Sequence, residues 1–336
     1  MRRAFALFAA AALTLGACNA PRATAPSESP SATSGASATP NFAGKTLNIA
    51  TGPTGGVYII YGAGIANVLT AKLGVAANAQ VTPASVDNMK LLRDGRADLA
   101  LTLSDTAFDA VKGINTFATP EKVVPAKALA VMYTNYTHIV AKEGLIKVTD
   151  LKGKRVSVGA AGSGTEVIAN RVLDAYGMSQ ADLQVQKLAV QPSADAVRDG
   201  KLDAFFWSGG LPTAAVLDLV NVGSVKVHLL DHTDILAKLQ QKYPGSYYEA
   251  KVPSGTYKND KDVAVIGVAN LLVVAATFDK ELAKAVLATL FDNKADLVKI
   301  HAEANNLKLE TASTGSPIDY HDGAIDFYKE KGVWKP

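Results

Sequence analysis

The same order of apolar segments and glycine-rich turns occurs twice in this chain of 336 residues, and that repeat constrains the fold most strongly. The first copy predicts a strand, a glycine-rich turn and a helix over residues 47–72. The second copy predicts the same three elements over residues 156–176. In both copies a further strand follows, at 81–83 and at 185–188, and then a helix and another strand. The repeat therefore predicts two similar α/β halves.

Two matching hexapeptides lie at the same point of each copy. Residues 93–98 are Arg-Asp-Gly-Arg-Ala-Asp and residues 198–203 are Arg-Asp-Gly-Lys-Leu-Asp, at an offset of 105. Glycine favours the left-handed conformation that ends many helices, so both hexapeptides predict a helix end before a strand. Strands that alternate with helices predict mostly parallel sheets with ligand sites at the carboxyl ends of the strands.

Two strand-rich regions, 123–140 and 263–277, predict the two crossings between the halves. We expect the first lobe to comprise residues 45–134 plus 266–336 and the second lobe residues 135–265. The expected hinges lie near Thr134 and at Gly267.

The first 44 residues predict an export signal, a lipid anchor and a linker. Arg2 and Arg3 precede an apolar run over 4–15, which is too short to span a bilayer but fits a signal peptide. The run ends in Leu15-Gly16-Ala17-Cys18, which resembles a bacterial lipobox. We expect a lipoprotein signal peptide over 1–17, a lipidated Cys18, and a disordered linker to residue 44; an ordinary secretory signal with a chance cysteine is the alternative. The predicted location is the periplasm or the outer face of a bacterial membrane, with a lipid anchor in the bilayer.

Composition narrows the possible functions. The 34 Lys and Arg side chains nearly balance the 31 Asp and Glu side chains, which argues against a nucleic-acid-binding protein. The single cysteine excludes a disulfide within the chain and a cysteine-cluster metal site. In the predicted linker, 18 of the 22 residues over 19–40 are Pro, Ala, Ser or Thr. Such a segment cannot bury enough apolar surface to offset its ordering entropy.

The two glycine-rich turns suit an anion. A strand that turns into a helix leaves several backbone N–H groups unpaired, and the helix dipole adds positive charge there. Gly55, Gly56 and Gly164 would let a ligand approach the backbone, while neighbouring hydroxyl groups add donors. Neither turn is a nucleotide signature, and we expect no cofactor and no metal. The alternative is that both helix ends are closed by their own caps.

Several segments are similar to those of the TRAP-associated extracytoplasmic immunogenic (TAXI) family over roughly 45–334. They are 51–58 (Thr-Gly-Pro-Thr-Gly-Gly-Val-Tyr), 104–109, 162–166, 203–212, 253–257, 267–274 and 317–324. The resemblance implies a two-lobed periplasmic-binding-protein fold in which two hinge strands join mostly parallel sheets flanked by helices. It also implies a receptor, not an enzyme, that captures a small organic acid or glutamate-like amino acid for the membrane permease of a TRAP transporter.

We expect the ligand-binding residues to come from the turns and strand ends of both lobes. Tyr58 is predicted to start a helix and Tyr133 to end a strand, and both offer an apolar ring with a hydroxyl. Ser85 and Asp105 are also predicted as helix N-caps. The full set is Thr54, Gly55, Gly56, Val57, Tyr58, Ser85, Ser104, Asp105, Tyr133, Ser163, Gly164, Thr165, Phe206, Ser208, Gly209 and Gly210.

The sequence departs from the family pattern at two of these turns, because Leu103 stands where relatives commonly have Gln and Pro53 where many have a small residue. A polar ligand contact would then be missing at Leu103. His228 and His232 have the spacing of a metal pair on a helix, but the pattern favours ordinary core or surface histidines. Two other functions stay open, the binding protein of an ABC importer and a secreted enzyme on a similar frame. A capture receptor works as a monomer.

Overall fold

The computed structural model describes residues 41–335, which belong to one folded unit. The predicted signal peptide, the lipidation site at Cys18 and most of the predicted linker lie outside the described residues.

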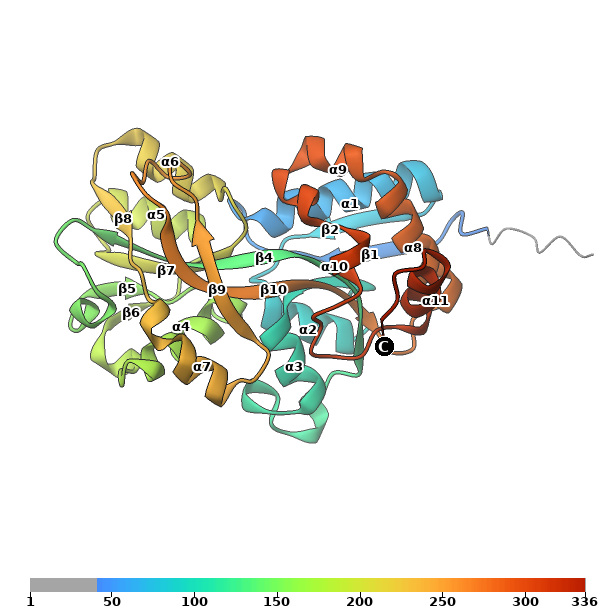
Figure 1. Cartoon of the computed structure of the whole chain (residues 1–336), viewed down its shortest axis with the longest axis horizontal. Coiled ribbons are helices and arrows are strands. Elements are labelled where there is room, and N and C mark those ends of the chain that lie inside the picture. Colours follow the sequence, from blue (N-terminus) through green and yellow to red (C-terminus); the bar gives the residue numbers. More distant parts are fainter. Residues whose placement is uncertain (1–40, 336) are drawn as a thin grey trace, which may run out of the picture. The chain divides into compact units, whose positions relative to one another are not determined.

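One mixed sheet of ten strands runs through the folded unit (Figure 1). Two of its strands are long and antiparallel to each other, and they join a parallel set on one side to a parallel set on the other. The long strands are β4 (Ala126–Lys142) and β10 (Val263–Ala275). These strands confirm the predicted crossings at 123–140 and 263–277.

The remaining strands flank this pair. On one side the order is β2 (Ala76–Gln80), β1 (Thr46–Ala50) and β3 (Leu99–Leu103), which pairs with β10. On the other side β4 pairs with β7 (Ala204–Gly209), which is followed by β5 (Arg155–Ser157) and β6 (Gln184–Gln186). Two further strands pair at the margins, β8 (Val227–Leu229) with β4 and β9 (Tyr247–Val252) with β10.

Helices cover both faces of the sheet (Figure 1). In chain order they are α1 (Val57–Leu73), α2 (Ser85–Arg93), α3 (Ser104–Lys112), α4 (Gly164–Ala175), α5 (Val190–Arg198), α6 (Ala214–Val222), α7 (Leu236–Lys242), α8 (Lys280–Asp292), α9 (Lys294–Ile300), α10 (Leu309–Ala312) and α11 (Asp322–Glu330). Short 3₁₀ turns are η1 (Asn115–Phe117), η2 (Pro120–Lys122), η3 (Val148–Leu151), η4 (Gln180–Asp182), η5 (Thr233–Ile235) and η6 (Ala302–Asn306). None of the helices within residues 41–335 has the length and apolar character needed to cross a membrane.

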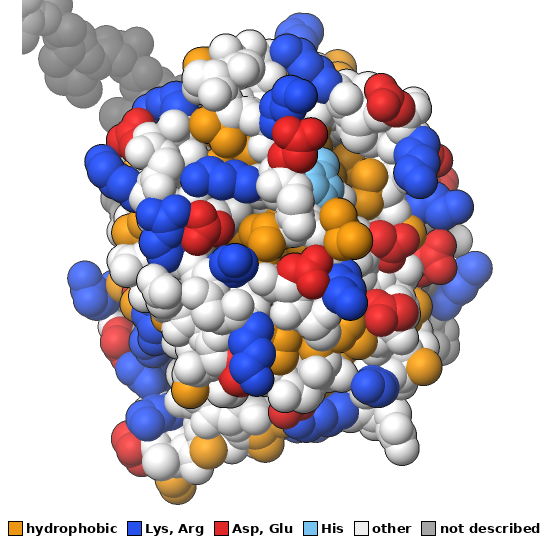
Figure 2. Space-filling model, turned by 90° about the vertical axis from the view of Figure 1, so that its left-hand side faces the viewer, with side chains coloured by type: hydrophobic (Ala, Val, Ile, Leu, Met, Phe, Trp, Pro, Cys, Tyr) orange, Lys and Arg blue, Asp and Glu red, His pale blue; other side chains and the backbone are white. Residues whose placement is uncertain are grey.

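Lysine, arginine and acidic side chains are interspersed on the face that carries β8 and α6 (Figure 2). The two signs of charge are mixed there rather than gathered into a basic patch. This distribution agrees with the near balance of charges in the sequence.

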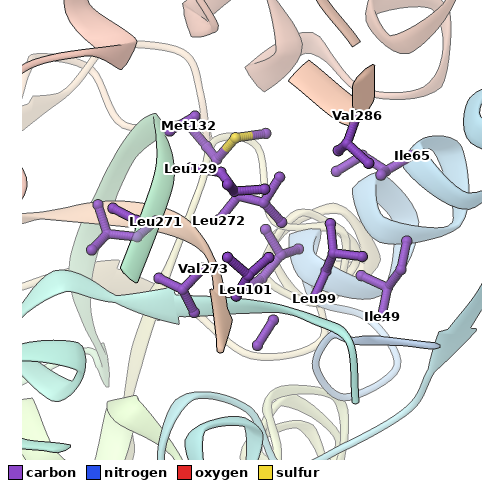
Figure 3. Packing of buried hydrophobic residues seen from close by; sticks show 14 of the residues in the cluster. Ile49, Ile65, Leu99, Leu101, Leu129, Met132, Leu271, Leu272, Val273 and Val286 are labelled. Atoms are coloured by element: carbon purple, nitrogen blue, oxygen red, sulfur yellow. The ribbon is translucent and has the colours of Figure 1, made fainter. Parts of the chain in front are cut away.

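Separate hydrophobic cores define the two lobes. The first contains buried residues from 42–133 and 271–328, and Figure 3 shows side chains of β1, β3, β4 and β10 meeting those of α1 and α8. The second and third lie almost wholly within 139–268. We call the part built on the first core lobe 1 and the part built on the other two lobe 2. The structure therefore has the predicted two-lobed α/β architecture.

Some element boundaries differ from the sequence predictions. The strand predicted at 81–83 is wrong, because β2 ends at Gln80. Ser85 and Asp105 are not N-caps but lie in the first turns of α2 and α3, where their side chains have other partners. Tyr133 lies inside β4 and not at its end, because that strand continues across the hinge.

Candidate ligand-binding site

Four helices begin where the lobes meet. Three of them, α1, α2 and α3, have no side-chain hydrogen bond at the N-cap. The fourth, α4, is capped by Ser163, whose Oγ accepts from the backbone N–H of Glu166 at 3.0 Å. The first-turn N–H groups of α1 have no capping side chain, whereas the N–H of Thr106 in α3 already donates to Asp105 Oδ1.

The turn before α4 packs against lobe 1. A Cβ atom added to Gly164 would lie 2.6 Å from both Leu103 Cδ1 and Ser85 Oγ, which is closer than real atoms approach. The backbone N–H of Asp87 donates to the carbonyl of Gly162 at 3.1 Å. Glycine at position 164 is therefore required for this close contact between the lobes.

The turn before α1 also contacts the other lobe, but at different residues. A Cβ atom added to Gly56 would lie 2.9 Å from the ring of Trp207. The N–H of Ala215 donates to the carbonyl of Gly55 at 3.4 Å. Both glycine turns thus lie at the interface of the lobes, and each has its own partner there.

A row of polar side chains follows the hinge strands between these turns. Tyr133, Asn135 and Thr137 occupy alternate positions of β4, so they share one face of the sheet. The strand register places Asn270 of β10 opposite Tyr133 and Ser208 of β7 opposite Thr137. We call these five residues the polar row. Each is at most 6% exposed.

The polar row has an unusual deficit of hydrogen bonds. Within the described residues, seven buried side-chain atoms have no partner: Tyr61 Oη, Tyr133 Oη, Asn135 Oδ1, Thr137 Oγ1, Ser208 Oγ, and Asn270 Nδ2 and Oδ1. Folded proteins rarely leave buried polar atoms unpaired, and each such atom costs about 1–3 kcal/mol. Six of the seven atoms belong to the polar row, so they gather on one face of the sheet.

Two tyrosines of α1 border the row. Asn135 Nδ2 donates to Tyr58 Oη at 3.5 Å, and the rings of Tyr61 and Tyr133 lie 5.9 Å apart. Burial raises the pKa of Tyr58, Tyr61 and Tyr133 above the ordinary tyrosine value. All three are therefore neutral phenols near pH 7 and can donate hydrogen bonds.

A buried ion network joins the lobes beside this row. Arg171 of α4 contacts Asp105 Oδ2 at 2.9 Å and Asp109 Oδ2 at 2.5 Å, both on α3. It also donates to Tyr247 Oη at 2.8 Å, and its guanidinium lies 4.1 Å from the ring centre of Tyr243. Burial alone would lower the pKa of Arg171, but Tyr247 and the two carboxylates raise it overall.

The expected site residues lie in different surroundings. Gly164 lies against Ser85 at the lobe interface, and Tyr58 contacts Asn135 of the polar row, to which Tyr133 and Ser208 belong. Two hydroxyls of the expected set already accept a backbone hydrogen bond: Ser85 Oγ accepts from the N–H of Leu103, and Thr165 Oγ1 accepts from the N–H of Ser208. The rest of the set is spread around them, with Val57 and Ser104 buried at the starts of α1 and α3, Thr54 exposed, Phe206 in a core, Gly209 against Trp207 and Gly210 against Glu303.

Sequence reasoning missed three members of the row, Asn135, Thr137 and Asn270. The sequence signal was weak, because residues 133–138 (Tyr-Thr-Asn-Tyr-Thr-His) are polar on both faces of the strand and single out neither face. Leu103, expected to cost a ligand contact, packs its side chain against Gly164. His228 lies in β8 and His232 in the loop after it, so they do not share a helix. Within residues 41–335 there is no cluster of three or more potential metal-ligating side chains.

The fold and this interlobe site define a protein of the periplasmic-binding-protein type of architecture. The sequence matches the NMT1-like family over residues 49–332, and the chain belongs to that family.

Solved structures share the fold at low sequence identity. A protein from Bordetella bronchiseptica RB50 is 16% identical, with 87% of this chain and 90% of that chain covered and a TM-score of 0.51. The periplasmic aliphatic sulphonate binding protein of Escherichia coli is 17% identical, with 87% and 94% covered and a TM-score of 0.46. The alkanesulfonate-binding protein of Xanthomonas axonopodis pv. citri bound to MOPS is 17% identical, with 79% and 81% covered and a TM-score of 0.46.

Proposed function

We propose that this protein is an extracytoplasmic solute-binding receptor that captures a small organic acid or acidic amino acid between its lobes. The observation that carries the proposal is the polar row, in which six buried side-chain atoms have no partner among the described residues. A ligand that pairs with these atoms would stabilise the closed arrangement of the lobes, because β4, β10 and β7 all contribute to the row.

The donors around the row favour a carboxylate. Phenol hydroxyls, side-chain amides and the uncapped start of α1 present hydrogen-bond donors. Arg171 is already paired with Asp105 and Asp109, so neutral donors rather than this guanidinium would hold the anion. Glutamate, 2-oxo acids and dicarboxylates fit this chemistry.

Delivery to a membrane permease follows from the sequence resemblance to the TAXI family. The turn at 51–58 and the strand at 267–274 carry that resemblance, and both lie at the interface of the lobes. A lipidated Cys18 would hold the receptor at the outer face of the membrane, and the linker would let the folded unit lie at a distance from the lipid anchor. The permease would be that of a TRAP transporter.

Isothermal titration calorimetry with glutamate, 2-oxoglutarate and related acids tests the site. Asn270→Leu removes two unpartnered buried atoms. We expect this variant to lose acid binding while its unfolding midpoint stays equal or rises, because an unsatisfied amide no longer has to be buried. Asn221→Leu makes the same replacement at an exposed asparagine of α6 and serves as the control.

Absence of heat with every acid would contradict the carboxylate proposal. Unchanged affinity in Asn270→Leu would remove the polar row from the site. If the purified protein converts the acid, as mass spectrometry would show, the secreted-enzyme alternative replaces the receptor. The genes beside the coding sequence decide between transporters, since an ATPase gene favours an ABC importer.

A further inference from the structure

A cavity lies in lobe 2, and no residue of the polar row lines it. It has a volume of about 450 Å³, which is within the range of roughly 300–1,000 Å³ that small-molecule sites occupy. Its walls come from α6, β4, β8, the start of β10 and the segment 257–261. A smaller hollow of about 350 Å³ shares five of its residues. Figure 2 shows this end of the molecule, with hydrophobic side chains exposed between lysines and acidic residues.

The wall of the cavity is aliphatic, and its rim is charged. Val140, Val216, Val220, Val227, Leu229 and Val263 form the apolar lining. Lys258 and Lys261 lie on the rim, are exposed, and have no ion-pair partner within the described residues. Asp260 is the one carboxylate among the lining residues, so the cations are in excess.

At the rim, Lys258 has a strained backbone conformation. Lys258 has a φ of 61°, in the left-handed region that side chains other than glycine and asparagine rarely adopt. Strained backbone of this kind occurs preferentially at ligand sites, where the surrounding structure holds it in place.

The floor of the cavity is connected to the lobe interface. Tyr257 lines the cavity, and its Oη accepts from the backbone N–H of Thr213 at 2.7 Å. Trp207 Nε1 donates to Thr213 Oγ1 at 2.8 Å, and the Trp207 ring packs on Gly56 of lobe 1. Occupancy of the cavity would therefore alter the surroundings of Trp207.

We propose that this cavity, the lobe 2 pocket, binds a small amphipathic carboxylate. The apolar tail lies between the aliphatic walls, and the carboxylate lies at Lys258 and Lys261. The apolar walls exclude a fully polar metabolite, while the two unpaired lysines favour an anion over a neutral apolar molecule. The concave shape favours a small molecule over a flat protein surface.

Sodium octanoate is the probe, measured by calorimetry and by the fluorescence of Trp207 in a Trp334→Phe background, where it is the sole tryptophan. We expect one octanoate per chain, a fluorescence change, and clearly weaker binding of butyrate and of neutral octanamide. Lys258→Asn combined with Lys261→Gln should raise the dissociation constant about five- to tenfold, and asparagine tolerates the left-handed backbone. Val220→Phe fills the pocket and should abolish binding.

Two control variants distinguish the lobe 2 pocket from octanoate binding elsewhere on the protein. Lys154→Gln, an exposed lysine of lobe 2, should leave octanoate affinity unchanged. Asn270→Leu alters the polar row and should also leave it unchanged, so failure of the receptor proposal would not affect this result. No binding at millimolar octanoate, or equal affinity in Val220→Phe, would overturn the proposal; a protein partner would then be the better candidate for this surface.

Discussion

Replacing Arg171 by Met tests how strongly the buried ion network holds the lobes together. Methionine keeps much of the apolar stem but removes the charge that pairs with Asp105 and Asp109. These two carboxylates are at most 5% exposed, so they would be left buried without a counter-charge. Breaking a buried pair in this way costs about 3–5 kcal/mol.

This loss of unfolding free energy corresponds to a measurable fall in the unfolding midpoint. At about 2 cal/mol/K per residue, a folded unit of this size unfolds with an entropy of about 0.6 kcal/mol/K. The expected loss in the unfolding midpoint is then about 5–8 °C by differential scanning calorimetry at pH 7. The triple variant, with Asp105→Asn and Asp109→Asn added, should recover most of that loss because it leaves no unpaired charge.

The pH dependence gives a second check on the same variant. Burial already raises the pKa of Asp109 above its ordinary value, and Arg171 opposes that rise. Without Arg171 the pKa of Asp109 rises further, so the folded state takes up a proton more readily than the unfolded chain. The loss of unfolding free energy in Arg171→Met, relative to the unaltered protein, is therefore largest above the raised pKa of Asp109. It becomes smaller as the pH falls through that pKa. A midpoint loss below about 1 °C, or a triple variant no more stable than the single one, would refute the reasoning.

Two further predictions follow from the close contacts and the buried histidines. Gly164→Val should weaken ligand binding more than tenfold by calorimetry, because its side chain would overlap Leu103 and Ser85 when the lobes close; the exposed Ala181→Val should bind normally, and equal affinity in the two would count against closure through this contact. Burial lowers the pKa of His138 to about 4, so stability is highest above about pH 6.5 and falls by about 3 kcal/mol as the pH drops to about 4; His138→Gln should show a shallower loss in that window, and an identical pH slope would argue against this histidine.

Local patterns in the sequence were sufficient to predict the architecture. The repeated strand–turn–helix order and the two long apolar crossings depend on neighbouring residues, and the structure confirms both. The helix boundaries were less accurate, since Ser85 and Asp105 lie in the first turns of helices and do not cap them. Their side chains accept hydrogen bonds from residues distant in the chain: Ser85 from the N–H of Leu103, and Asp105 from Arg171.

In the candidate site, too, local features could be predicted from the sequence and contacts between distant residues could not. Sequence patterns identified the two glycine turns, because glycine at these positions indicates that another group approaches the backbone closely. The polar row depends on the register of β4 against β10 and β7, which pairs residues more than 70 positions apart. Residues 133–138 of β4 are polar on both faces, so the sequence indicated neither which face is used nor what lies opposite it.

By itself, the sequence determined the two-lobed α/β frame and the places where backbone donors would gather, because short-range periodicity and glycine turns dictate both. Only the tertiary structure decided that Arg171 neutralises Asp105 and Asp109, that five side chains form the polar row, and that the lobe 2 pocket connects through Tyr257 to Trp207. These features join residues distant in the chain, and strand register and lobe packing alone bring them into contact.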